Sequence, residues 1–91
     1  MTQLPREQIL DLARRHGVQS VRVFGSQARG ESTAGSDVDL LVRMDAGRDL
    51  FDLVAFRRAL EKLLALPVDV VSEGGLSPLL KDRILAEARP L

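Results

Sequence analysis

Several kinds of functional site are excluded by what this chain lacks. It contains no cysteine, which rules out disulfides, thiol nucleophiles and zinc–thiolate sites. Its single histidine, His16, cannot form a His-rich metal centre. Aromatic residues make up 3% of the chain and none is Trp or Tyr, which argues against a base-stacking platform for nucleic acid. No thiol, multi-histidine or aromatic site is therefore expected.

The chain also lacks an excess of charge and any long apolar run. Its 13 basic and 13 acidic side chains give a net charge of zero, so direct binding to nucleic acid or to an anionic membrane is not expected. Uninterrupted apolar runs reach no more than four residues, whereas a membrane span needs about 20. The first residues do not follow the pattern of a secretory signal. We therefore expect a cytoplasmic protein.

What remains is an ordinary globular composition in a short chain. Hydrophobic residues make up 45% of the 91 residues and charged residues 29%. This length fits one domain, residues 1–91, and not two. A chain of this size buries only about 60–65% of its unfolded surface, so a modest stability and a stabilising partner are both expected.

Hydrophobic periodicity and capping residues predict alternating helices and strands. Pro5 suits the first position of a helix and Gly17 the residue just past its end. Asp49 suits the N-cap of a long helix that carries Asp52 in capping-box position. The predicted helices are residues 5–16, 50–66 and 78–88, and the predicted strands are residues 18–24, 37–43, 68–72 and, short, 89–91.

This order predicts an α/β (α+β) fold with a small mixed β-sheet flanked by helices. Strand 37–43, the long helix and strand 68–72 can form a right-handed parallel crossover. Strands 18–24 and 37–43 are joined by about a dozen residues and could be antiparallel neighbours, although loop length alone does not decide this. The loop after residue 24 is rich in Gly, Ser and Thr, with a short helical turn expected near residues 27–29.

Three carboxylates are the candidate metal ligands. Asp37 and Asp39 are two apart on a predicted strand, so both side chains point to one face. Two such carboxylates repel each other unless a cation lies between them, and hard oxygen ligands suit Mg²⁺ or Mn²⁺. Asp69 is the one charge in an apolar strand. If its strand lies beside residues 37–43, the three carboxylates can form a two-metal site for phosphoryl or nucleotidyl transfer.

Candidate phosphate contacts lie just before these carboxylates in the sequence. Gly25 has no side chain, so a phosphate can approach its backbone closely. Ser26 offers a hydroxyl and a backbone N–H at the start of a predicted helical turn. Arg29 can pair with a phosphate through two N–H groups. The chain thus offers phosphate donors on one segment and metal ligands on the next.

The pattern Gly25-Ser26, ten residues, then Asp37-Val38-Asp39 resembles the signature of the DNA-polymerase-β-like nucleotidyltransferase superfamily. The sequences around it resemble the minimal nucleotidyltransferase (MNT) branch, over almost the whole chain. This resemblance implies the polymerase-β-like fold. It also implies that Asp37 and Asp39 are metal ligands, with Asp69 as the third acidic residue. We expect two Mg²⁺ ions at this site, the second held by Asp69. Gly25 and Ser26 are then the contacts to the phosphates of ATP.

The MNT resemblance also implies a partner. Many MNT proteins are encoded beside a HEPN-domain ribonuclease toxin and act as its antitoxin by transferring AMP from ATP to a toxin tyrosine. For this chain the resemblance therefore implies an antitoxin of a type VII-like toxin–antitoxin pair, in a hetero-oligomer with a HEPN toxin. Because the chain has no Tyr, the acceptor must lie in another molecule.

Other interpretations of the same residues remain open. Asp37 and Asp39 can be surface charges on a half-exposed strand, and Asp69 a solubility charge on an edge strand. Arg29 is as compatible with a structural surface role as with phosphate binding. The functional alternatives are an antitoxin that neutralises its toxin by complex formation without catalysis, and nucleotidyl transfer to a small molecule.

Overall fold

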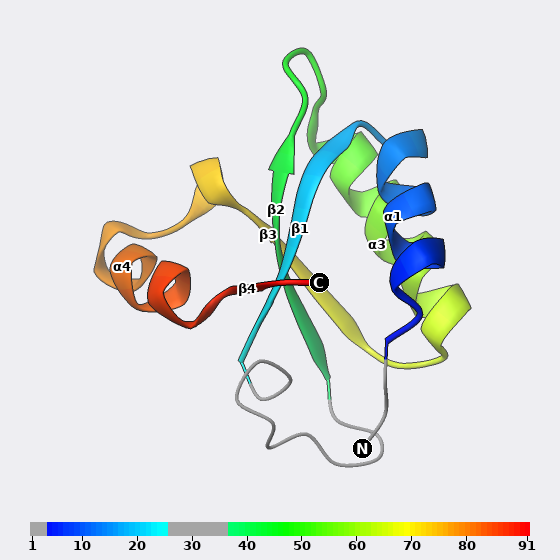
Figure 1. The fold of residues 1–91 in the computed structure, drawn as a ribbon. Coiled ribbons are helices and arrows are strands. Elements are labelled where there is room, and N and C mark those ends of the chain that lie inside the picture. Colours follow the sequence, from blue (N-terminus) through cyan, green and yellow to red (C-terminus); the bar gives the residue numbers. More distant parts are fainter. Residues whose placement is uncertain (1–3, 26–36) are drawn as a thin grey trace.

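A computed structural model of the chain describes residues 4–25 and 37–91 (Figure 1). The described elements follow the predicted order of helices and strands. They also include a 3₁₀ helix between the third strand and the last α-helix. In chain order they are α1 (Arg6–Arg15), β1 (Val18–Phe24), β2 (Val38–Met44), α3 (Leu50–Leu64), β3 (Val68–Ser72), the 3₁₀ helix η1 (Glu73–Gly75), α4 (Pro78–Glu87) and β4 (Arg89–Pro90).

The strands form one mixed four-stranded sheet in the order β3-β2-β1-β4. β1 pairs antiparallel with β2 and with β4, while β2 and β3 are parallel. α3 connects these two parallel strands, as the sequence predicts for residues 37–72. The predicted small mixed sheet with flanking helices is therefore confirmed.

One face of the sheet carries the hydrophobic core. α1 and α3 pack on this face and against each other (Figure 1). Strand residues that point toward the helices alternate with residues that point away, because side chains of a strand alternate between its two faces. The buried cluster consists of Ile9, Ala13, Val18, Val21, Val23, Val38, Leu40, Val42, Phe56, Leu60 and Val68.

Capping residues set the ends of α1 and α3. Pro5 is the N-cap of α1 rather than its first helical residue, so the helix begins at Arg6, one residue later than predicted. Asp49 caps α3 and forms the predicted capping box with Asp52. α3 ends at Leu64, two residues before the predicted end, because Ala65 adopts the left-handed conformation with φ 55°. No Gly or Asn marks that position, and the nearest signal in the sequence is Pro67, two residues after the C-cap.

α4 lies apart from the core (Figure 1). None of its residues is buried, and Leu79 and Leu80 are 92% and 51% exposed. Its last residues lead into β4, which pairs with β1 through Arg22 and Val23. Within residues 4–25 and 37–91, no helix is long and apolar enough to cross a membrane.

Candidate functional site

The candidate site lies where one end of β1 meets the starts of β2 and β3. β1 runs antiparallel to β2, so its last residues lie beside the first residues of β2. β3 runs parallel to β2, so it begins at the same end of the sheet. The register places Phe24 opposite Asp39, and Asp39 opposite Asp69. The topology thus brings together residues that are 45 positions apart along the chain, since Phe24 and Asp69 both flank Asp39.

Asp39 and Asp69 lie on the face of the sheet that α1 and α3 leave uncovered. Their neighbours Val38, Leu40 and Val68 are buried on the other face, so strand alternation turns both carboxylates away from the core. Opposite residues on neighbouring strands have Cβ atoms about 5 Å apart. Asp39 is partly buried and Asp69 is exposed. The register thus places Asp69 beside Asp39, and a cluster of all three carboxylates stays a prediction.

Gly25 has a second role that the sequence did not reveal. Its φ is +72°, a conformation that L side chains rarely adopt. A Cβ atom at this position would overlap Oδ2 of Asp39 and lie 3.2 Å from its Cγ. The missing side chain therefore makes room for the Asp39 carboxylate. Closeness to a phosphate stays a prediction.

For the three other predicted site residues, the described strands do not define where the side chain points. Asp37 is exposed and lies one residue before the first residue of β2, so strand alternation does not define the direction of its side chain. The strand was predicted to begin at Asp37, but β2 begins at Val38, so strand alternation does not place Asp37 and Asp39 on one face. Ser26 and Arg29 lie outside the described residues, as does the helical turn predicted around them.

The donor chemistry at this edge fits a magnesium ion that is shared with a substrate. Mg²⁺ is commonly held by one or two carboxylates, with water and phosphate oxygens as the remaining ligands. Asp39 and Asp69 offer two carboxylates from adjacent strands. In the described part of the chain, no group of three His, Asp or Glu side chains could hold a metal ion. The arrangement fits a metal completed by a nucleotide rather than one enclosed by protein, and the three-carboxylate cluster stays a prediction.

An ion pair lies further along the same face. Arg22 of β1 lies opposite Leu41 of β2, and its Nη2 is 3.3 Å from Oε1 of Glu73 in η1. Leu41 is 1% exposed, although it belongs to the face away from α1 and α3. Arg22 is a site neighbour that the sequence alone did not suggest. Its one signal is that it is the only charged residue of β1.

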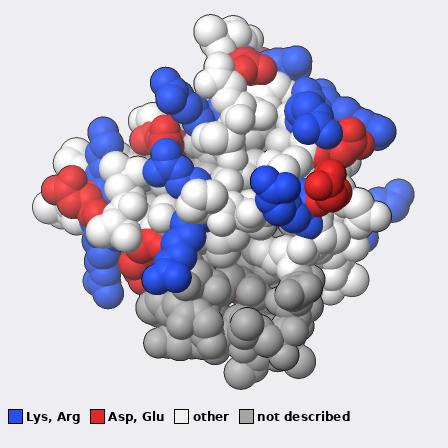
Figure 2. Space-filling view, viewed as in Figure 1, with Lys and Arg blue, Asp and Glu red and all other residues white. Residues whose placement is uncertain are grey.

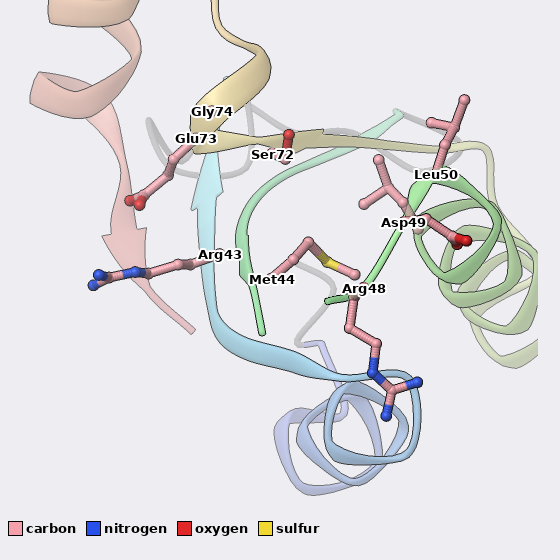
Figure 3. Close-up of a pocket in the computed structure, with 9 residues that line it drawn as sticks. Arg43, Met44, Arg48, Asp49, Leu50, Ser72, Glu73 and Gly74 are labelled. Atoms are coloured by element: carbon pink, nitrogen blue, oxygen red, sulfur yellow. The ribbon is translucent and has the colours of Figure 1, made fainter. Parts of the chain in front are cut away.

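A cavity of about 510 Å³ lies at the other end of the sheet. Figure 3 shows side chains from the end of β2, the start of α3 and η1 around it. Arg48 is one of the residues that line it and pairs with Asp52, with 3.2 Å between Nη1 and Oδ1. Because Asp39 and Asp69 are at the start of their strands, this cavity is separate from the carboxylate site.

The surface charge is mixed. On the face shown in Figure 2, basic side chains are interspersed with acidic ones. This distribution agrees with the net charge of zero. The local pairing of Asp39 and Asp69 is therefore not part of a general excess of acidic residues.

Comparison with known proteins identifies the family. The nucleotidyltransferase domain family matches residues 5–91. A Methanocaldococcus jannaschii protein, named for protein adenylyltransferase activity, is 43% identical over 83 residues, which cover 91% of this chain and 89% of that protein. The protein adenylyltransferase MntA of Thermococcus cleftensis is 38% identical over 77 residues, 85% of this chain and 78% of the relative.

Solved structures agree with this fold. A structure described as a minimal nucleotidyltransferase has 53% identity and a TM-score of 0.84, and the match covers 94% of this chain and 88% of that one. A toxin–antitoxin structure with AMP-PNP has 24% identity and a TM-score of 0.82, over 96% and 72% of the two chains. A tri-AMPylated Shewanella oneidensis HEPN toxin in complex with its MNT antitoxin gives 23% identity and a TM-score of 0.73, over 99% and 71%.

The family, the fold and the paired strand carboxylates point to the same class of protein. The sequence match spans nearly the whole chain, and the structural match extends over both the sheet and its helices. The chain belongs to the nucleotidyltransferase domain family, among relatives named protein adenylyltransferases.

Proposed function

We propose that this chain transfers AMP from ATP to a tyrosine hydroxyl of a partner HEPN-domain toxin, and that it acts in this way as the antitoxin of the pair. The observation that carries the proposal is the register of Asp39 and Asp69 beside Gly25. Relatives named protein adenylyltransferases support a protein acceptor. The AMPylated HEPN toxin bound to an MNT antitoxin supports the kind of partner.

The nucleotide and its metal are assigned to the carboxylate edge of the sheet. Asp37, Asp39 and Asp69 are the proposed Mg²⁺ ligands, and Gly25, Ser26 and Arg29 the proposed phosphate contacts. Bound Mg²⁺ offsets the negative charge of the phosphates and of the leaving group. The AMP-PNP complex of a protein with the same fold supports a nucleoside triphosphate as substrate.

At phosphorus, the reaction forms one bond and breaks one. The tyrosine oxygen attacks the α-phosphorus of ATP, and the bond from this phosphorus to the oxygen that bridges to the β-phosphate breaks. The products are a tyrosine–AMP phosphodiester and pyrophosphate. Asp69, the exposed carboxylate of the pair, orients the hydroxyl and accepts its proton. Positioning and electrostatics account for most of the rate.

The test compares two Asp→Asn variants in a transfer assay. With ATP labelled at the α-phosphate and the purified partner, Asp69→Asn is expected to lower label transfer by about 100-fold or more, while ATP binding is partly retained. Asp45→Asn is the matched control, since Asp45 follows the last residue of β2 at the opposite end of the sheet. Transfer by Asp69→Asn at the rate of the control would contradict the assigned role of Asp69.

A neutralisation assay separates catalysis from binding. The double variant Asp37→Ala/Asp39→Ala is expected to lose both label transfer and protection of cells that express the toxin. Protection without transfer would support an antitoxin that acts by complex formation. Label transfer to a small molecule in the absence of any partner protein would instead support a small-molecule acceptor.

A further inference from the structure

β3 forms an edge of the sheet. Its inner side pairs with β2 in continuous register from Val68 to Ser72. Within residues 4–25 and 37–91, no strand pairs with its outer side. A strand edge of this kind carries free N–H and C=O groups that can pair with another extended chain.

The hydrogen bonds at the start of β3 tell which residues face outward. The N–H of Val38 donates to the carbonyl of Pro67 at 3.0 Å, so the backbone of residue 67 faces β2. Backbone groups of successive strand residues point alternately to the two sides. Asp69 and Val71 therefore face β2 as well. The N–H and C=O groups of Val68, Val70 and Ser72 face the outer edge.

This edge lies directly beside the candidate acceptor base. An extended segment paired with β3 places a residue opposite Asp69, about 4.8 Å away in the direction of the hydrogen bonds. Its side chain lies on the same face as the Asp69 carboxylate, because opposite residues share a face. The β3 edge can thus align a segment so that one of its hydroxyls reaches Asp69.

The residues of β3 favour such pairing. Three of the five are Val, a β-branched residue that suits extended backbone. Edge strands are commonly protected by Lys, by Pro within the strand or by a bulge. β3 has none of these over residues 68–72, and its one charge is Asp69. The β1–β2 ladder, by contrast, contains an irregularity between Val18 and Ser20.

We propose that the acceptor segment of the partner protein binds in extended conformation along the outer edge of β3, with the acceptor hydroxyl residue opposite Asp69. This inference rests on the proposed function, because it assigns the binding mode of the acceptor at the same site. It assigns recognition to the backbone of Val68, Val70 and Ser72, so side-chain specificity for neighbouring acceptor residues is weak.

Amide hydrogen exchange provides the direct test. In the free chain, the outward amides of Val70 and Ser72 are expected to exchange fast, and the inward amides of Asp69 and Val71 slowly. Saturation with the purified partner toxin, its acceptor tyrosine replaced by Phe, is expected to slow the outward amides by about tenfold or more. The inward amides are internal controls. Outward amides that still exchange fast in the saturated complex would overturn the proposal.

Proline substitutions test the same edge in the transfer reaction. Ser72→Pro removes one outward donor, and the φ of Ser72, −83°, is close to the angle that a proline ring imposes. The KM for the partner is expected to rise by about 2- to 10-fold, the effect of one hydrogen bond, while the KM for ATP is unchanged. Asp45→Asn, just past the last residue of β2, is the control and should leave both values unchanged.

Val70→Pro removes the central outward donor and should also raise the KM for the partner. Equal KM values for Ser72→Pro, Val70→Pro and the wild type would contradict pairing at β3. Failure of the proposed function has a different result: the wild-type chain then transfers no label to the toxin, whatever the exchange pattern.

Discussion

Replacement of Gly25 by Ala tests the link between backbone and carboxylate most directly. Two effects are expected from the geometry. The left-handed conformation of residue 25, with φ +72°, costs about 1–2 kcal/mol once a Cβ is present. The new methyl group also overlaps Oδ2 of Asp39. Since ordinary non-bonded contacts are about 3.5 Å or longer, the carboxylate must move by about 1 Å.

The expected loss of activity is larger than the loss of stability suggests. A misplacement of about 1 Å in a catalytic constellation can lower the rate by about 100-fold. Gly25→Ala should therefore lower the free energy of unfolding by about 1–2 kcal/mol, measured by urea denaturation, and lower label transfer from α-labelled ATP by about 100-fold.

Gly47→Ala separates strain from contact. Gly47 has a similar φ of +85°, but a Cβ there meets no atom within 4 Å. This control should lose comparable stability and retain transfer activity. If Gly25→Ala transfers AMP as fast as Gly47→Ala, the Asp39 carboxylate does not depend on the space at residue 25, and the reasoning is refuted.

Two further predictions concern the stability of the core and of α3. Phe56 is fully buried, so Phe56→Ala should lower the free energy of unfolding by about 3–5 kcal/mol in urea denaturation, whereas substitution of exposed Phe51 should have little effect. The backbone N–H of Asp49 donates to the Asp52 carboxylate and lowers the pKa of Asp52 below 3.8, with a further contribution from Arg48. A carboxyl whose pKa is lower in the folded chain than in the unfolded chain stabilises the fold at pH values above the unfolded pKa. This stabilisation should disappear as the pH falls below about 4. Thermal unfolding of Asp52→Asn should lack that part of the pH dependence; an unchanged acid profile would contradict it.

Much of the fold follows from short-range signals. The parallel pairing of β2 with β3 follows from two apolar strands joined by a capped helix, and Asp49 and Asp52 mark the start of that helix. The end of the helix at Leu64 does not follow, because Ala65, which is exposed, adopts a left-handed conformation that is more usual for Gly or Asn. The 3₁₀ helix after β3 had only a Gly-Gly signal, which equally predicts a loop.

Less of the site than of the fold could be predicted from the sequence. Asp69 stood out as one charge in an apolar strand, and alternation along the strands explains why it shares a face with Asp39. The alignment of Asp39 with Asp69 depends on strand register, and register is decided by packing between distant segments. The contact between Gly25 and Asp39 depends on the same register, so the sequence suggested the glycine for a different reason.

The position of α4 outside the core has a consequence for how the chain unfolds. None of the residues of α4 is buried, and the strand pairing that follows it, β4 with β1, spans two residues. Such a segment opens at a lower free energy than the sheet and forms a separate cooperative unit. Far-UV signals, which include α4, should therefore begin to change before the core does, and the two melting curves should not superimpose.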